Sequence, residues 1–322
     1  MNNILITSAG QRVSLVKAFQ NEIKKLDDMN KVYTVDLNPL LAPACHVSDG
    51  YKQVPRVTED YYIQTLLSIC KEWEIKIVIP TIDTELKVLA ESKDYFKEEG
   101  IDVIVSDVEF INACRDKRII NDFFTVKGID IPKAISKNKL KFPLFIKPYD
   151  GSLSKDIFLI KKEEDLTDYH FSNPKFMFME YIDHNVYDEY TVDTYYNKKS
   201  ELVCVVPRKR MTVRAGEINK GVTKDNELVN TIKSKLPYIK GARGCLTMQF
   251  FYHPITKRIV GIEINPRFGG GYPLSYLAGA NYPKYIIDEY ILGKSIAYYE
   301  GWEKNLLMLR YDDEVLVHNY GE

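Results

Sequence analysis

The stretch from Gln249 to Gly271 carries the residues best suited to chemistry. It reads QFFYHPITKRIVGIEINPRFGGG, in which two apolar runs flank a short turn, as in a β-hairpin. With residues 254–258 as the loop, Gln249 lies opposite Glu263, and directly opposed side chains are about 5 Å apart at Cβ. Because side chains alternate across a strand, Asn265 shares the face of Glu263. We therefore expect one carboxylate and two amide oxygens to converge.

Oxygen ligands of this kind favour magnesium. Three are too few to enclose an ion, so the set suits Mg²⁺ that is also held by phosphates, with Mn²⁺ as an alternative. Arg267 and three consecutive glycines follow, and they supply a cation beside a backbone that a ligand can approach closely. An ordinary solvated hairpin with a polar outer face is the other interpretation.

Length and composition describe a soluble globular protein. The 322 residues, 45% hydrophobic and 28% charged, suffice for two domains with separate cores. A net charge of −1 gives no field that would attract nucleic acid or a membrane, and no apolar run reaches the roughly 20 residues of a membrane span. Five scattered cysteines without a CxxC pair predict a reduced, cytoplasmic setting.

The first 106 residues alternate strands and helices, which predicts a parallel, doubly wound sheet. The turn after the first strand holds one glycine instead of GxGxxG, which argues against a dinucleotide-binding dehydrogenase. Asp83 follows a parallel strand at the edge where such sheets bind ligands, so it is a candidate substrate contact, with helix capping as the alternative. The expected strands are Asn3–Thr7, Val32–Val35, Tyr51–Val54, Ile75–Ile79 and Ile101–Val105, and the expected helices are Val13–Leu26, Tyr61–Trp73 and Thr84–Phe96.

Phosphate-binding features appear in the next part of the chain. Residues 107–126 have a helical pattern, and the apolar strand FPLFIK ends in Lys147. A Gly/Ser loop follows, and a lysine beside such a loop can supply charge while hydroxyls and backbone N–H groups supply directed donors. The P-loop pattern GxxxxGK[ST] is absent.

Later segments contribute further polar residues. The strand Phe176–Ile182 contains Glu180, and a carboxylate in such a run is costly unless it is partnered. On an extended chain Arg208, Arg210 and Arg214 point the same way and could grip an anionic substrate, or they could form a solvent-facing basic strand. We also expect helices at Leu228–Leu236 and Tyr282–Leu292, and a strand pair within residues 305–319.

Taken in order, these motifs resemble the ATP-grasp superfamily, and within it the single-module proteins similar to the large subunit of carbamoyl-phosphate synthase. Asp116-Lys117 resembles the first nucleotide lysine motif, FIKP the second, MEYI the adenine hinge, DEYTVD the ribose-binding acid, and Gln249 with EINPRFGG the metal site. The resemblance implies an α/β and α+β protein. Residues 1–106 would be a Rossmann-like pre-ATP-grasp domain and residues 107–322 a two-subdomain ATP-grasp domain, with 117–182 the smaller, lid-like part and 183–322 the larger, metal-binding part.

The resemblance also implies ATP and Mg²⁺ as cofactors and a role for each matching residue. Lys117 and Lys147 would hold phosphates, and Ser152 and Ser154 would lie in the loop over them. Adenine would be contacted by Glu180, Tyr181 and Ile182, and ribose by Glu189. The metal would be bound by Gln249, Glu263 and Asn265, and Arg267 would stabilise the transferring phosphoryl group. Lys147, Glu263 and Arg267 are the expected catalytic residues. The loop departs from the family pattern with Asp156 in place of glycine, although aspartate tolerates a left-handed backbone.

The activity that the resemblance implies is ATP-dependent ligation of a small-molecule carboxylate to an amine through an acyl phosphate, with release of ADP and phosphate. An amino acid is the expected partner by family analogy, and homodimers are common among relatives. One alternative is phosphorylation of bicarbonate or carbamate, as in carbamoyl-phosphate synthase, which the single module and the lack of a glutaminase argue against. The other is a non-catalytic ATP-binding sensor, for which Asp156 is the best support.

Overall fold

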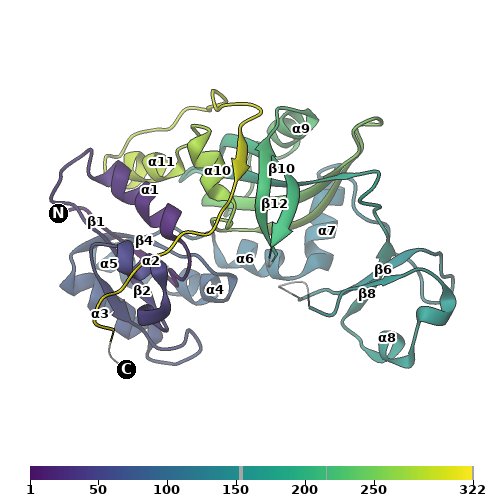
Figure 1. The fold of residues 1–322 in the computed structure, drawn as a ribbon, viewed down its shortest axis with the longest axis horizontal. Helices are drawn as coiled ribbons and strands as arrows, with labels where there is room; N and C mark the ends of the chain where they lie inside the picture. The colour runs from purple at the N-terminus through teal and green to yellow at the C-terminus, as the bar shows by residue number, and fades with distance from the viewer. Residues whose placement is uncertain (152–154, 215, 321–322) are drawn as a thin grey trace.

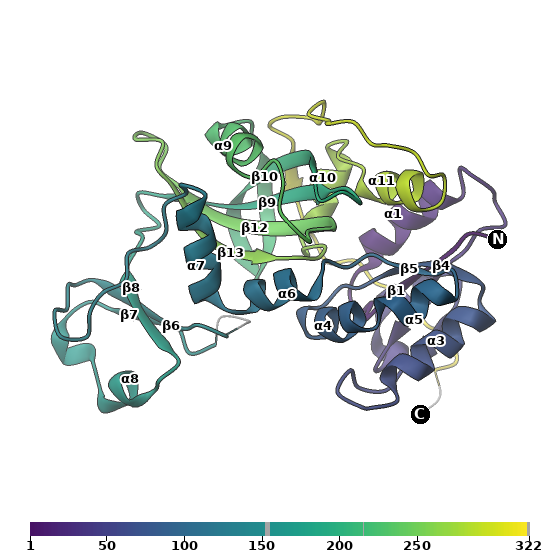
Figure 2. The same cartoon turned by 180° about the vertical axis from the view of Figure 1, so that it is seen from behind.

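The protein contains three β-sheets arranged in a row (Figure 1). The computed structural model describes residues 1–151, 155–214 and 216–320. The N-terminal sheet and the small sheet lie at opposite ends, and the large sheet lies between them, as the view from behind also shows (Figure 2). Within the described ranges, no helix has both the length and the apolar character needed to cross a membrane.

The N-terminal domain is the parallel, doubly wound sheet that the sequence predicts. Leu5 packs into the core on one face, whereas Ile4 and Ile6 pack into the core on the other, beneath α1. In sheet order its strands are β3 (Tyr51–Gln53), β2 (Val32–Asp36), β1 (Asn3–Thr7), β4 (Ile75–Ile79) and β5 (Asp102–Val103). Its helices are α1 (Val13–Ile23), η1 (Pro39–Leu41), α2 (Pro43–Val47), α3 (Tyr62–Glu72), α4 (Asp83–Glu91) and α5 (Lys93–Glu98).

The strand order reverses between β1 and β4, because the chain runs outward from β1 through β2 to β3 and then returns to β1's other side. Open α/β sheets bind ligands outside the carboxyl ends of the strands at such a reversal. The loop after β1 and the loop after β4 meet there, where the Thr81 hydroxyl donates hydrogen bonds to the carbonyls of Thr7 (3.0 Å) and Ser8 (2.7 Å). Asp36 accepts a hydrogen bond from the Gly10 amide (2.9 Å) and so holds the turn after β1.

The central sheet is antiparallel throughout. Its strands, in sheet order, are β13 (Ile259–Asn265), β12 (Gly244–Tyr252), β9 (Asp188–Tyr196), β10 (Leu202–Arg214), β11 (Glu217–Thr223) and β14 (Leu307–Leu309). The accompanying helices are α6 (Val108–Arg115), α7 (Lys117–Val126), α9 (Glu227–Lys235), α10 (Tyr272–Leu277) and α11 (Tyr282–Tyr290). The predicted hairpin register is confirmed, with Gln249 paired to Glu263.

The helical pattern of residues 107–126 forms two helices where a single pattern was expected. Asp116 lies between α6 and α7 in an extended conformation, and its carboxylate accepts a hydrogen bond from the Arg118 amide (2.9 Å), which caps α7. The break turns α7 onto β13 (Figure 2), where a Cβ on Gly261 would lie 2.6 Å from the ring of Phe124. Lys117 therefore occupies the first position of a helix that is fixed against the central sheet.

The small antiparallel sheet has β6 (Leu144–Pro148) between β7 (Phe158–Ile160) and β8 (Phe176–Glu180), accompanied by α8 (Asp168–Ser172) and η2 (Glu163–Asp165). It has its own small core, which includes Leu144, Ile146 and Phe178. This core fixes β6, the strand that carries Lys147, between its two neighbours.

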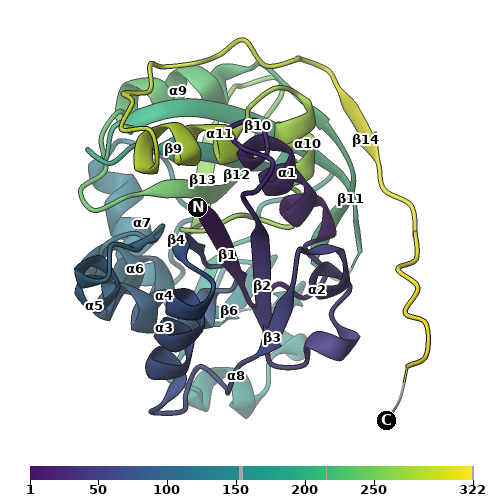
Figure 3. The same ribbon diagram turned by 90° about the vertical axis from the view of Figure 1, so that its left-hand side faces the viewer.

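The C-terminal segment differs from the predicted strand pair. Only Leu307–Leu309 forms a strand, β14, which pairs with β11, and the chain then continues as an extended segment (Figure 3). The acidic run Asp312, Asp313 and Glu314 begins three residues after β14 and is exposed, and Leu316 and Val317 beyond it are exposed as well, so this part of the segment buries no apolar face against the sheet.

Candidate active site

The predicted metal-binding residues lie together on one face of the β12–β13 hairpin. Gln249, Glu263 and Asn265 are all half-buried, and the Asn265 amide donates a hydrogen bond to Glu263 Oε1 (3.0 Å). In the described part of the chain, no three His, Cys, Asp or Glu side chains converge as a metal cluster. One carboxylate with two amides therefore fits Mg²⁺ that takes its remaining oxygens from phosphates, because hard oxygen donors are what that ion prefers.

Lys147 faces this hairpin from the small sheet. Its side chain is 7% exposed, and burial lowers the pKa of its ammonium to about 8. The Glu263 carboxylate opposes this lowering of the pKa, and the Lys117 ammonium adds to it, so both charges lie within electrostatic reach of Lys147. A bound anionic phosphate would favour the charged form of such a buried lysine.

The loop after Lys147 is partly described. Lys117 Nζ donates to the Gly151 carbonyl (2.5 Å), and its amide donates to the Tyr149 carbonyl (2.9 Å), so the two lysine motifs are in direct contact. Asp156 has φ of +53°, the left-handed conformation that the sequence led us to expect it to tolerate. Ser152 and Ser154, the predicted phosphate contacts, lie outside the described residues.

Glu180 ends β8 and has the partner that its position requires. Arg258 Nη1 lies 3.2 Å from Glu180 Oε1, and the Lys133 amide donates to Oε2 (3.2 Å). Burial would raise the pKa of this carboxyl, but the hydrogen bonds from Arg258 and Lys133 more than offset it, and the pKa is lowered. Glu180 is thus tied through Arg258 to the start of β13 in the β12–β13 hairpin. Tyr181 and the buried Ile182 follow it directly.

The three arginines expected to form one row occupy three separate environments. Arg208 is 1% exposed and forms a bidentate pair with buried Asp193 (2.8 and 3.0 Å). Arg210 Nε lies 3.3 Å from Glu189, the predicted ribose contact. Arg214 is exposed and pairs with Asp312 in the C-terminal segment (2.6 Å). Arg208 and Arg210 thus both pair with carboxylates of β9, whereas the register shifts in β10 on either side of Thr212 separate Arg214 from them. Because each guanidinium already has a carboxylate partner, the three do not form one open basic row.

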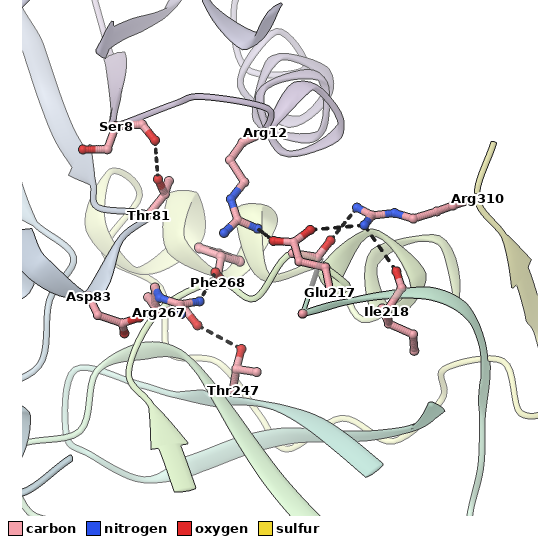
Figure 4. Close-up of polar contacts among 12 residues, drawn as sticks. Ser8, Arg12, Thr81, Asp83, Glu217, Ile218, Thr247, Arg267, Phe268 and Arg310 are labelled. Atoms are coloured by element: carbon pink, nitrogen blue, oxygen red, sulfur yellow. Dashed lines mark hydrogen bonds and ion pairs between the residues drawn. The ribbon is translucent and has the colours of Figure 1, made fainter. Parts of the chain in front are cut away.

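Arg267 connects the hairpin to the N-terminal domain. Its Nη2 lies 2.6 Å from Asp83 Oδ2, so the predicted substrate contact and the predicted catalytic arginine form an ion pair (Figure 4). The Arg267 carbonyl accepts a hydrogen bond from the Thr247 hydroxyl (3.0 Å). The sequence analysis did not single out Arg12, Glu217 or Arg310, which surround this pair. Arg12 could have been found from the sequence, because it directly follows the turn after β1, at the edge of the sheet where ligands bind.

Two family models match the chain. Residues 4–104 match the PylC-like N-terminal domain, and residues 172–309 match the ATP-grasp domain described as belonging to a biosynthetic pathway with the Ter operon. No curated protein sequence gives a significant match.

Solved structures share the fold. Biotin carboxylase from Campylobacter jejuni is similar over 95% of this chain and 74% of its own, at 14% identity and a TM-score of 0.73. N5-carboxyaminoimidazole synthetase from Staphylococcus aureus is similar over 92% of this chain and 78% of its own, at 16% identity and a TM-score of 0.66. L-amino acid ligase from Bacillus licheniformis is similar over 90% and 74%, at 14% identity and a TM-score of 0.65. At these identities the likeness concerns the arrangement of the chain.

Proposed function

Since the chain belongs to the ATP-grasp superfamily, we propose that it is an ATP-dependent ligase that joins a carboxylate to an amine through an acyl phosphate and releases ADP and phosphate. The observation that carries this proposal is that Lys117 and Glu263 both lie within electrostatic reach of the buried Lys147. The three side chains come from α7, the small sheet and the central sheet, and their types match the needs of a polyphosphate with its metal.

Each side chain has a task in this reaction. Lys147 and Lys117 would hold the phosphates of ATP between the two sheets. Gln249, Glu263 and Asn265 would hold Mg²⁺, which when bound neutralises phosphate charge and orients the terminal phosphoryl group. Arg267, held by Asp83, would place a fixed cation beside the carboxylate that attacks that group. Positioning and charge neutralisation suffice for such a transfer, so the reaction needs no nucleophilic serine or cysteine.

The products of ATP distinguish the mechanisms. The protein is incubated with Mg-ATP and pooled amino acids and small carboxylates, nucleotides are separated by chromatography, and condensed products are sought by mass. ADP together with a condensed mass supports the ligase and identifies its substrates. AMP with pyrophosphate contradicts the acyl-phosphate mechanism. ADP formed with bicarbonate alone would favour the carbamoyl-phosphate synthase-like reaction. Thermal stabilisation by Mg-ATP without turnover would favour a sensor.

Lys147→Ala tests the site itself. We expect this variant to lose turnover because the buried ammonium lies within electrostatic reach of Glu263, the proposed metal ligand. Lys233→Gln is a control, since Lys233 also pairs with a carboxylate, Glu300 (3.1 Å), but does so on the exposed surface of α9. Near wild-type turnover by Lys147→Ala would refute the assignment of the phosphate site.

A further inference from the structure

A second group of charged residues lies at the reversal point of the N-terminal sheet and has no role in the reaction above. Arg12 precedes α1, Glu217 begins β11, and Arg310 follows β14 (Figure 4). Arg12 Nη1 is 3.4 Å from Glu217 Oε1, and Arg310 Nη1 is 3.2 Å from Glu217 Oε2. Three distant parts of the chain therefore meet at one carboxylate, beside the Asp83–Arg267 pair.

The charges of these five residues do not balance. Arg12, Arg267 and Arg310 carry three positive charges, and Asp83 and Glu217 carry two negative ones. Burial lowers the pKa of the Arg12 guanidinium, Glu217 opposes this effect, and Arg267 and Arg310 lower the pKa further. The three guanidinium groups thus lie in one another's field, and an additional anion would relieve their repulsion.

Several guanidinium donors in this group have no protein partner. Among the described residues, the ion pair with Glu217 is the one polar contact of the Arg12 side chain, which is 19% exposed. Arg267 Nε is buried and has no hydrogen-bond partner among the residues that the structure describes. A guanidinium has five N–H donors, and a half-buried one that uses so few of them favours an anionic ligand.

Arg310 is held more firmly than Arg12. Its Nη2 donates to the Gly270 carbonyl (2.6 Å), and its Nη1 donates to the Ile218 carbonyl (3.3 Å). Gly270 in turn leaves room for the Glu217 carboxylate, since a Cβ on this glycine would lie 2.0 Å from it. Gly270, in the run that follows the β12–β13 hairpin, is therefore in direct contact with both Arg310 and Glu217.

We propose that Arg12 and Arg310 bind an anionic group of a substrate, a carboxylate or a phosphate, that is distinct from the carboxylate undergoing phosphorylation. The inference rests on the proposed function, because Arg267 is there assigned to the reacting end. In space, Arg12 and Arg310 lie on one side of Arg267, and the strands of the β12–β13 hairpin, which carry the proposed metal-binding residues, lie on the other (Figure 4). A substrate with a second anionic group would span these two positions, whereas one with a single carboxylate would leave Arg12 without a partner.

Calorimetry in the presence of Mg-ADP tests this site without requiring turnover. The probes are succinate, succinamate, which replaces one carboxylate by an amide, and inorganic phosphate. We expect succinate or phosphate to bind, and succinamate to bind about tenfold more weakly than succinate if a carboxylate is the preferred group. Binding of phosphate but not succinate would assign a phosphate-bearing substrate.

Variants assign the binding to these arginines. Arg12→Gln and Arg310→Gln should each weaken anion binding about tenfold or more while leaving Mg-ADP affinity and the melting temperature close to wild type. Arg12→Lys should restore part of the loss, and the surface control Lys233→Gln should bind as wild type does. The proposal is overturned if neither anion binds the wild-type protein, or if both glutamine variants bind as it does. If anion binding depends on Arg12 but no substrate yields ADP, the ligase proposal fails and the anion site stands.

Discussion

The pH dependence of nucleotide binding tests whether Lys147 holds the phosphates. In the free protein, burial lowers the pKa of this ammonium to about 8, because the side chain is 7% exposed and Lys117 lies near it. Bound phosphates would favour the charged form, so ATP should bind mainly to the protonated protein. Since the pKa is lowered, the protonated form predominates below pH 8 and is lost as the pH rises through that value.

The size of the effect follows from the pKa. If only the ammonium form binds, the apparent Kd for Mg-ATP is nearly constant up to pH 7, rises about twofold at pH 8 and rises about tenfold at pH 9. Isothermal titration calorimetry between pH 6.5 and 9.5, at constant free Mg²⁺ and without a second substrate, measures this curve.

Lys147→Arg is the matched control, because a guanidinium remains charged over the whole pH range. Its Kd should stay flat, whatever its value at pH 7, and a melting curve at each pH checks that the larger side chain is accommodated. A flat curve for the wild-type protein would refute the reasoning. So would an equal slope in the arginine variant, since the titrating group would then lie elsewhere.

Three further predictions follow from buried contacts. Glu263→Gln removes the one charged member of the proposed metal-binding set of the hairpin, so ADP release at saturating Mg²⁺ should fall at least about 100-fold while the melting temperature changes little. Asp193→Asn leaves Arg208 as a buried cation without a counter-charge and should lower the free energy of unfolding in urea by about 3–5 kcal/mol, whereas an unchanged midpoint would contradict the pair's structural role. Gly261→Ala places a methyl group against the Phe124 ring, 2.6 Å from its nearest atom, and should cost about 1–3 kcal/mol in the same assay.

Much of the fold could be predicted because its signals are local. Continuous apolar runs with turns between them are enough to identify parallel strands, and the loop length fixed the pairing of Gln249 with Glu263. The break between α6 and α7 was missed because apolar residues with helical spacing lie on both sides of the charged run 115–118. The contact that separates the helices depends on the extended backbone conformation of Asp116, which lets its carboxylate cap α7. The strand pair expected in residues 305–319 was wrong. Weak alternation of apolar and polar residues predicts a strand only where one face of the strand is buried, and most of this segment is exposed.

The arginines show where sequence reasoning about the site ends. Arg208, Arg210 and Arg214 have the spacing of one face, but each pairs with its own carboxylate. Arg208 and Arg210 pair with Asp193 and Glu189 of β9, whereas Arg214 pairs with Asp312 in the C-terminal segment. Asp193 lies diagonally across from Arg208 on the neighbouring strand, and neither the pairing of β9 with β10 nor its register could be inferred from the sequence. Arg12 and Arg310 meet only because β14 joins the edge of the central sheet beside the N-terminal domain.

In the proposed function, the N-terminal domain lines the active site and does not bind the nucleotide. Its first turn uses Asp36 to hold the Gly10 amide, whereas a dinucleotide fold would use the acid at this strand end to reach a ribose. The carboxyl edge of its sheet instead presents Asp83 to Arg267 and Arg12 to Glu217. The orientation of Arg267 therefore depends on the domain interface. A change that shifts this interface should alter the reacting end of the site while Lys147, which belongs to a separate sheet, keeps its place.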